Sequence, residues 1–263
     1  MKKISFFFVF LFFACGNSSK KVETPIPTAN TTLQGISTRV LFEKYKEGRA
    51  LLPAKQIYEI GKLNPVDEAQ NDTVFFIFRE KLLDAIRKKD ILYLLEQLDP
   101  NITVSFGGSE GLEAFTQAWQ LTSEEKTINS PLWKELEKTL QLGGTFDQTS
   151  QLFLSNYVYA TIGEPYDPYI HAVVVGSGVR YRTAPSLQAK VVDRLSYDII
   201  EVLDNQGPKE TIGGETYPWV KIKSLAGKEG YIFGKYLVSP IDYRAGFKKM
   251  DGRWKMIFFV AGD

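Results

Sequence analysis

Residues 173–239 are the part of the chain whose local pattern most constrains its fold. Short segments rich in Val, Ile, Leu, Tyr and Trp alternate there with clusters of Gly, Pro, Asp and Asn. This alternation indicates short antiparallel strands joined by turns, and a small barrel is an economical way for such strands to hide their edges. The interval between Leu203 and Trp219 is too polar and too rich in Gly and Pro for a strand, so we expect a long exposed loop.

The same stretch also carries a set of residues at characteristic places. It opens with a Val-rich strand, an arginine and a Pro-Ser turn, and it ends with an aromatic residue before a short strand, a Gly-Tyr pair and a Tyr-Leu pair. The residues concerned are Val179, Arg182, Pro185, Ser186, Trp219, Gly230, Tyr231, Tyr236 and Leu237. In these features the stretch resembles a bacterial SH3-type domain (Src-homology 3), and we place the barrel at residues 170–240. The resemblance implies a binding module that engages peptidoglycan or peptides.

Aromatic residues with polar tips near the first turn and the expected loop are the candidate ligand contacts of this barrel. They offer apolar area and a hydrogen bond while losing little rotamer entropy. The arginine beside them has two roles open to it, pairing with a ligand carboxylate or making a structural hydrogen bond, and the tryptophan is an equal candidate for the barrel core. The candidates are Tyr181, Arg182, Tyr197, Tyr217 and Trp219.

The beginning of the chain has the pattern of an exported protein. Two lysines precede the apolar run Ile4–Ala14, which is about half as long as a membrane-spanning helix, so residues 1–14 are predicted to be a signal peptide. The run ends in Phe-Phe-Ala-Cys-Gly, which resembles a bacterial lipobox with Phe12 where Leu is usual. The resemblance implies lipid attachment at Cys15. The alternative is an ordinary cleaved signal with an incidental cysteine.

Residues 15–33 are predicted to be the lipid-bearing cysteine and a flexible tether. The segment after the cysteine is polar and lacks an apolar period, and as a coil its ends would lie roughly 20–25 Å apart. Gly16 and Asn17 differ from the Asp that retains lipoproteins in the inner membrane of enteric bacteria, which favours the outer membrane. Because Cys15 is the only cysteine of the chain, we expect no internal disulfide.

The residues before the barrel predict mainly helices. Apolar residues recur at three- and four-residue steps from Thr73, with Arg79 on the polar face, which is typical of an amphipathic helix. Asp90 is placed to cap a second helix, and Ser130-Pro131 begins another that ends at Gly143-Gly144. The other expected elements are an alternating strand at Ile102, Val104 and Phe106, a helix carrying Leu112, Phe115 and Trp119, and a strand-like segment at residues 152–162.

The residues after the barrel predict a β-hairpin. Asp251-Gly252 is a preferred two-residue turn, and apolar residues occupy alternate positions from Trp254 to Val260. A hairpin alone is marginal in water, and a small barrel has no room for its apolar face. We therefore expect an α+β fold in which a discontinuous domain, residues 34–165 plus 241–263, is interrupted by the SH3-like barrel. Helices, a strand and a closing hairpin also resemble the cone-shaped fold of the nuclear transport factor 2 superfamily.

One motif is that of a serine hydrolase. Gly107–Gly111 satisfies G-x-S-x-G between a strand and a helix, which would make Ser109 the nucleophile, His171 its base, and Asp147 or Asp167 the third group. The chain lacks the alternation of strands and helices that builds a parallel sheet beneath such a nucleophile. We therefore expect Ser109 to be the N-cap of the next helix instead.

Other catalytic and binding classes have less support. A cone-shaped fold can host an acid–base pair, but no two acids are spaced as a visible pair. Lys plus Arg, 32, nearly balances Asp plus Glu, 31, so no basic excess indicates nucleic acid, and no metal-ligand cluster or nucleotide-binding glycine loop occurs. We therefore expect a lipid-anchored, non-catalytic protein of the bacterial envelope without cofactor or metal. Its expected partners are the membrane, through Cys15, and peptidoglycan or an envelope protein or peptide, through the barrel.

Overall fold

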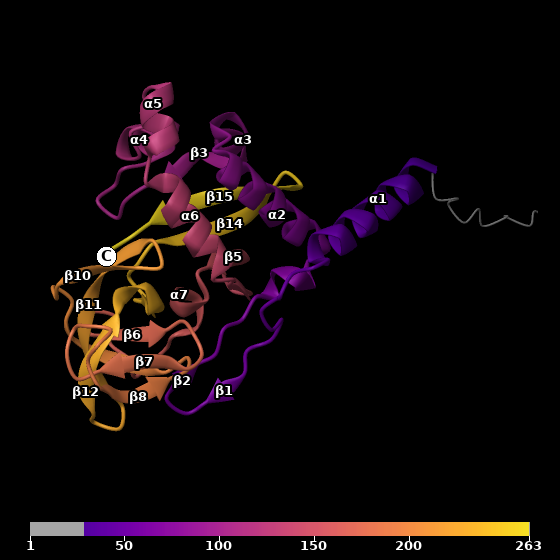
Figure 1. Ribbon diagram of the computed structural model, residues 1–263. Coiled ribbons are helices and arrows are strands. Elements are labelled where there is room, and N and C mark those ends of the chain that lie inside the picture. The colour runs from indigo at the N-terminus through magenta and orange to yellow at the C-terminus, as the bar shows by residue number, and fades with distance from the viewer. Residues whose placement is uncertain (1–28, 263) are drawn as a thin grey trace, which may run out of the picture.

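The structure is a computed structural model that describes residues 29–262, with side chains described from residue 37. The predicted signal peptide, Cys15 and most of the predicted tether lie outside these residues. Helix α1 (Ala29–Lys46) includes the last residues of the predicted tether, so the tether prediction is wrong for residues 29–33. The helix projects from the body of the molecule, and its Phe42 ring packs edge-on against Phe76 at 5.0 Å (Figure 1). Between residues 29 and 262, no helix combines the length and apolar character that a membrane crossing requires.

A five-stranded sheet with helices packed against it forms the first part of the molecule (Figure 1). Its strand order is β3-β15-β14-β5-β4, and only the β3–β15 pair is parallel. The strands are β3 (Leu98–Thr103), β4 (Thr145–Asp147), β5 (Leu152–Ser155), β14 (Arg244–Met250) and β15 (Arg253–Val260). The helices of this part are α2 (Thr73–Lys88), α3 (Ile91–Gln97), α4 (Gly111–Ala118), α5 (Glu124–Asn129), α6 (Leu132–Gln141) and α7 (Tyr157–Thr161).

The core of this part is aromatic and lies between α2 and the sheet. The ring of Phe75 lies 4.3 Å from that of Phe153 and 4.7 Å from that of Trp254, measured between ring centroids. Phe247 packs against the same ring at 5.6 Å. The core therefore joins one helix to three strands that are far apart in sequence.

The predicted helices and the hairpin turn are confirmed where local signals were strong. The Asp90 carboxylate accepts a hydrogen bond from the Tyr93 amide at 3.1 Å, as an N-cap does. Helix α6 begins after Ser130-Pro131 and ends before Gly143, whose φ of 69° is a conformation that glycine adopts readily. The turn between β14 and β15 has positive φ at Asp251 and Gly252, which matches a type I′ hairpin.

Other expectations are wrong in position or in type. The strand expected at 102–106 is β3, which begins at Leu98, so Asp99-Pro100-Asn101 lies within the strand and Phe106 is exposed. The strand-like segment at 152–162 is strand β5 followed by helix α7, and its Tyr157 and Val158 are buried by α7 packing on the barrel side. Arg79, expected on the solvent face of α2, is buried.

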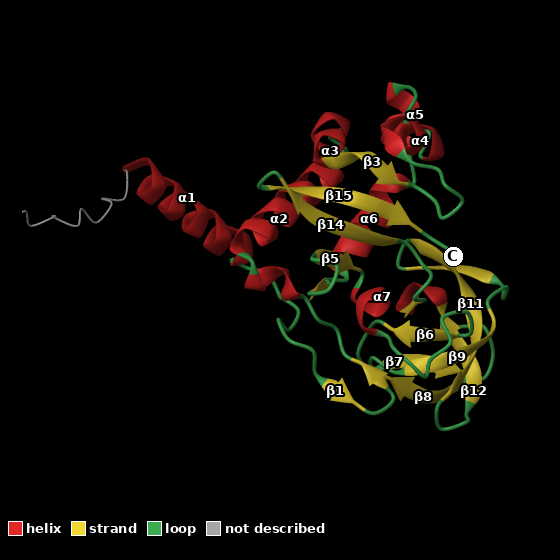
Figure 2. Cartoon of the chain, turned by 180° about the vertical axis from the view of Figure 1, so that it is seen from behind, coloured by secondary structure: helices red, strands yellow, loops and turns green. Residues whose placement is uncertain are grey.

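The second part is an eight-stranded antiparallel sheet, curled as expected for a small barrel (Figure 2). Its order is β13-β6-β9-β11-β12-β7-β8, with β10 paired to β11. The interval predicted to be a long loop contains β10 and much of β11, so its Gly213-Gly214 is a hairpin turn. The strands are β6 (His171–Val174), β7 (Val179–Arg182), β8 (Val191–Leu195), β9 (Ile199–Asp204), β10 (Lys209–Ile212), β11 (Glu215–Ser224), β12 (Glu229–Phe233) and β13 (Leu237–Val238), with a 3₁₀ turn at Gly234–Tyr236.

The two parts meet across a small apolar cluster that includes α7, which lies between β5 and β6 in both views (Figures 1 and 2). Tyr157 and Val158 of α7 join Leu63 and Val66 in contact with barrel residues Val173, Ile199 and Val238. The short hairpin of β1 (Tyr58–Glu59) and β2 (Lys62–Leu63) adds backbone bonds, since the Leu63 amide donates to Tyr197 O at 2.8 Å. A groove lies beside this cluster.

Candidate functional site

The groove lies between α6, the segment before α2 and one side of the barrel. Its volume is about 570 Å³, within the range of pockets that bind small molecules. Both parts of the molecule contribute to its walls, so neither part forms it alone. The residues that line it are Leu52, Pro65, Lys134, Glu137, Lys138, Gln141, Leu142, Tyr157, Val175, Tyr197, Glu215, Tyr217 and Lys235.

Helix α6 forms the polar wall of the groove. Lys134, Lys138 and Gln141 recur at three- and four-residue steps, which places them on one face of the helix. The opposite face carries buried Leu132, Trp133, Leu136 and Leu140, which pack into the first core. Because the apolar face of α6 packs into the first core, its lysines lie on the opposite face, which borders the barrel.

Two tyrosines form the barrel wall. The ring of Tyr217 packs edge-on against that of Phe233 at 5.7 Å, and Lys134 Nζ lies 4.9 Å from the Tyr217 ring centroid. Tyr197 occupies a turn with φ of 61°, where its amide donates to Gly176 O at 3.1 Å. Backbone bonds and ring packing therefore hold both tyrosines in place before any ligand arrives.

The two carboxylates of the groove are already paired. Glu215 forms an ion pair with Lys235, and this hydrogen bond, together with the nearby lysines of α6, lowers the pKa of the Glu215 carboxyl. The same bond raises the pKa of the Lys235 ammonium. Glu137 accepts from Arg87 Nε at 2.8 Å and from Gln141 Nε2 at 2.9 Å. Both carboxylates are thus engaged by neighbouring donors.

Tyr157 supplies a buried hydroxyl to the lining of the groove. The side chain is 1% exposed, and among the residues described its hydroxyl has no hydrogen-bond partner. Burial raises the pKa of this phenol above its ordinary value, with a smaller contribution from Tyr197. The hydroxyl is therefore a neutral donor at physiological pH. An acceptor that bound it would stabilise the complex by about 1 kcal/mol or more, because a buried polar group without a hydrogen bond is destabilising by about that amount.

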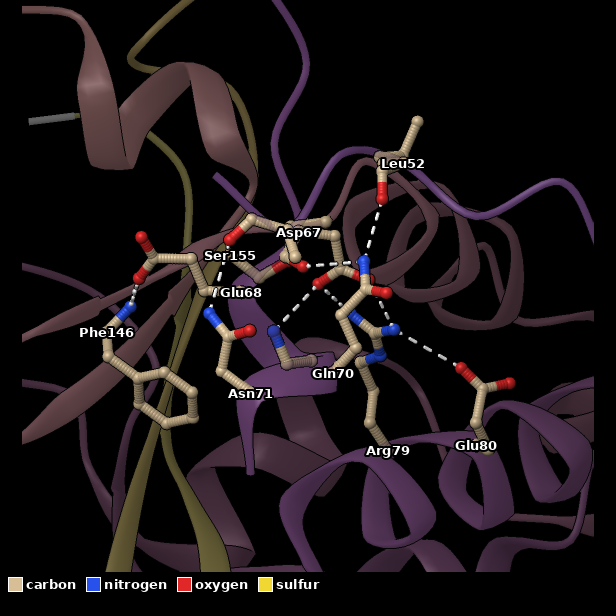
Figure 3. Close-up of polar contacts among 12 residues, drawn as sticks. Leu52, Asp67, Glu68, Gln70, Asn71, Arg79, Glu80, Phe146 and Ser155 are labelled. Carbon is tan, nitrogen blue, oxygen red and sulfur yellow. Dashed lines mark hydrogen bonds and ion pairs between the residues drawn. The ribbon is translucent and has the colours of Figure 1, made fainter. Parts of the chain in front are cut away.

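Asp67, Arg79 and Glu80 form a buried charge cluster, whose polar contacts are drawn in Figure 3. The Arg79 guanidinium donates from both terminal nitrogens to the Asp67 carboxylate, at 2.6 and 2.7 Å, and lies 3.3 Å from Glu80 Oε1. Arg49 also pairs with Glu80. The side chains of Asp67, Arg79 and Glu80 are 3–6% exposed, none of them lines the groove, and they are held to one another by ion pairs.

The cluster and its neighbours position one wall of the groove. Gln70, a few residues after Asp67, donates from Nε2 to Leu52 O at 2.7 Å, and Leu52 lines the groove (Figure 3). Glu68 accepts from the Phe146 amide at 2.9 Å and so ties the same segment to β4. The Asp67–Arg79 pair therefore holds the segment before α2 against that helix, and Glu68 holds the same segment against the sheet.

The five predicted ligand contacts of the barrel separate into three groups. Tyr197 and Tyr217 line the groove. Arg182 donates from a terminal nitrogen to Ala189 O at 2.8 Å, which is the structural hydrogen bond left open as its alternative. Tyr181 is 1% exposed and lies in the barrel core, so its assignment as a surface contact is wrong. Trp219 is also 1% exposed, so it is not a surface contact either. It packs against Phe233 at 5.8 Å and donates from Nε1 to Glu210 Oε2 at 2.6 Å, on the face of β11 opposite to the core residues Val220 and Ile222. The alternation of side chains along β7 points Tyr181 inward together with Val179.

The candidate hydrolase residues are not brought together. Ser109 is exposed in the turn between β3 and α4, where its carbonyl accepts from the Val104 amide at 2.9 Å. His171 Nδ1 lies 3.1 Å from Asp167 O, and its ring packs against Tyr166. No hydrogen bond joins Ser109 to His171 in the part of the chain that is described. The predicted helix cap is also wrong, since the N-cap of α4 is Glu110 and its side chain makes no capping bond.

Sequence reasoning missed the α6 side of the groove. The predicted helix between Ser130-Pro131 and Gly143 contains Lys134 and Lys138, but neither lysine was a predicted contact, and Tyr157 belonged to a predicted strand. The spacing of the two lysines indicates that they lie on one face of the helix. It does not indicate which other part of the molecule lies opposite that face. Within residues 29–262 no group of three or more His, Cys, Asp or Glu side chains is arranged to hold a metal.

Comparison with known proteins identifies one module. Residues 177–238 match the profile of the bacterial SH3 domain family, which confirms the prediction for this stretch. Domains of this family are commonly binding modules for peptidoglycan or proteins. No curated protein and no solved structure matches the chain. The matched residues include Tyr197, Glu215, Tyr217 and Lys235 but not α6, so the groove combines an SH3 surface with a wall from outside the module.

Proposed function

We propose that this chain is a lipid-anchored, non-catalytic binding protein of the bacterial envelope that holds its ligand in the groove between the SH3 domain and α6. The observation that carries the proposal is the groove itself, in which Tyr197 and Tyr217 of the barrel face Lys134 and Lys138 of α6. Aromatic rings beside charged groups are typical of protein binding sites. The bacterial SH3 domain also suggests an extracytoplasmic or envelope-associated protein.

The ligand that we propose is a stem peptide of peptidoglycan, with a peptide of an envelope protein as the alternative. Both are ligand types of the SH3 family, and the groove volume of about 570 Å³ is enough for a few residues of peptide. The groove provides an apolar ring face, hydroxyls and ammonium groups together. A short peptide with polar side chains would use all three.

The first part of the molecule is proposed to be a scaffold. We infer a discontinuous domain, residues 34–165 plus 241–263, because β14 pairs with β5 and β15 pairs with β3 across the barrel segment. Its helices and closing hairpin suit the cone-shaped fold of the nuclear transport factor 2 superfamily. We propose no catalytic role for it, since its buried acids Asp67 and Glu80 are engaged by Arg79. This first part contributes to binding through α6, which forms one wall of the groove.

Wall binding is tested by co-sedimentation. A soluble chain of residues 29–263 should pellet with purified peptidoglycan sacculi at low salt and remain in the supernatant without them. If it stays in the supernatant in both cases, wall binding is rejected and an envelope protein becomes the ligand to seek.

Tyr217→Ala should weaken that binding by about 1 kcal/mol or more, roughly fivefold in Kd, because the ring supplies apolar contact area in the groove. The melting temperature should change little. Tyr58→Ala is a matched control, since Tyr58 is 88% exposed on β1 and does not line the groove. An equal loss of binding and stability in Tyr217→Ala would show that this ring is a structural contact of Phe233.

The lipid anchor is tested by metabolic labelling with a fatty acid. The parent protein should be labelled and Cys15→Ser should not, because the proposed attachment site is the only thiol of the chain. Membrane fractionation of the two proteins should follow the label. Equal labelling of both would contradict the anchor, whatever the outcome of the wall-binding experiment. If the label is lost as expected, fractionation of inner and outer membranes then tests the proposed outer-membrane location.

A further inference from the structure

The two lysines of α6 differ from the other charged groups of the groove because they lack a carboxylate partner. Lys134 Nζ contacts the Tyr217 ring, and in the described part of the chain neither Lys134 nor Lys138 takes part in an ion pair. The two residues are four apart, so their side chains leave the same face of the helix one turn from each other. The two charges are therefore close together and outside any direct ion pair, and the carboxylate that they act on across the groove is Glu215, whose pKa they help to lower.

The carboxylates that could compensate them are used elsewhere. Glu215 is paired with Lys235 on the barrel, and Glu137 is paired with Arg87 of α2. Lys138 also borders a second, smaller hollow that contains Asp242, and Asp242 accepts a hydrogen bond from the Ser239 amide at 2.9 Å. Three lysines and two glutamates line the groove, an excess of one positive charge, and Lys134 and Lys138 are the cations of this set that lie outside a direct ion pair.

A neutral hydrogen-bond donor lies in the same groove. The Tyr157 hydroxyl is buried and unpartnered within residues 29–262, an arrangement that costs free energy unless something accepts from it. A carboxylate oxygen accepts from both ammonium and phenol donors, and hydrogen bonds to a charged acceptor are stronger than those between neutral groups. Two cations outside any direct ion pair and one unpartnered hydroxyl thus favour the same kind of ligand atom.

We propose that the groove recognises the carboxylate groups of a peptide, with Lys134 and Lys138 as charge partners, Tyr157 as hydrogen-bond donor and Tyr217 as the apolar surface beside them. This proposal rests on the proposed function of the groove as the ligand site. It assigns the ligand chemistry to α6, which lies outside the residues that match the SH3 family. The family module then supplies the aromatic wall, and the first part of the molecule supplies the specificity for acidic groups.

The test uses a soluble stem tetrapeptide with free carboxylates and the same tetrapeptide with every carboxylate amidated. Residues 29–263 should bind the free form, and amidation should weaken binding roughly tenfold or more because the charge-assisted bonds are lost. The double variant Lys134→Met/Lys138→Met should lose a similar factor for the free form. The amidated form should bind the parent and this variant equally, since each change removes the same interaction.

Two further variants control for charge and fold. Lys248→Met removes one positive charge at an exposed position on β14, away from the groove, and should leave binding unchanged. Lys134→Arg/Lys138→Arg keeps both charges and should retain most of the affinity. Melting temperatures of all variants should stay close to that of the parent, because Lys134 is exposed and Lys138 is only half-buried.

Each other outcome has a definite meaning. If the parent binds the free and amidated peptides equally, or if the methionine variant binds the free form as well as the parent does, carboxylate recognition is overturned. If the protein pellets with sacculi but binds neither tetrapeptide, wall binding stands and this proposal fails. If it binds the free tetrapeptide through the lysines but does not pellet with sacculi, wall binding fails and carboxylate recognition stands.

Discussion

Deletion of residues 243–263 should abolish cooperative unfolding of the first part of the molecule. These residues contain β14 and β15, which are central strands of the order β3-β15-β14-β5-β4, so the deletion separates β3 from β5. It also removes five buried core residues, which are Ala245, Phe247, Trp254, Met256 and Phe259. Thermal unfolding followed by far-ultraviolet circular dichroism should lose the transition of the helices and keep that of the barrel.

The barrel is expected to survive because it has a core of its own. Ten buried residues of β6 to β13, among them Ile200, Ile222 and Ile232, pack together without a residue from the first part. The isolated segment of residues 170–240 should therefore give its own transition. If the truncated chain keeps the helical transition unchanged, the hairpin does not belong to the first part and the discontinuous domain is wrong.

A milder version of the same change keeps the chain length. Phe247→Ala should destabilise the first part by about 3–5 kcal/mol, as removal of a fully buried phenylalanine does. Met250→Ala is the matched control on the same strand, because Met250 is 40% exposed beside the turn and its loss should cost well under about 1 kcal/mol. Comparable losses in the two variants would show that the inner half of β14 is no better packed than its exposed end.

Arg79→Met should destabilise the protein by about 3–5 kcal/mol, because it removes the cation from a buried cluster and leaves the Asp67 carboxylate without its charge partner. Urea denaturation followed by circular dichroism measures the loss. Arg87→Met on the same helix is the control. The Arg87 side chain is 40% exposed, and loss of its ion pairs should change stability by less than about 1 kcal/mol.

A second substitution separates the cluster from simple packing. Asp67→Asn together with Arg79→Met should recover part of the stability, because the uncompensated buried charge is then absent. If Arg79→Met costs no more than Arg87→Met, the cluster does not hold the segment before α2. If the double variant is no more stable than Arg79→Met alone, the loss comes from packing of the arginine stem instead.

The sequence by itself determined the elements that depend on neighbours along the chain. The period of apolar residues in α2 and α6, the cap at Asp90 and the turn at Asp251-Gly252 act within a few residues, so their structures follow from local chemistry. The SH3 domain is predicted for the same reason, since its strands and turns are short and close in sequence.

The tertiary structure alone decided which polar residues are buried and which are brought together. The sequence predicts Arg79 on the solvent face of its helix, but in the structure it is buried in an ion pair with Asp67 of another segment. The sequence likewise predicts Tyr181 as a ligand contact, but in the structure it is buried in the barrel core. The groove has the same origin. Lys134 and Lys138 line the same groove as Tyr197 and Tyr217 because α7 and the residues before α2 pack against the barrel and place it beside α6. Local periodicity cannot predict contacts between residues so far apart in the sequence.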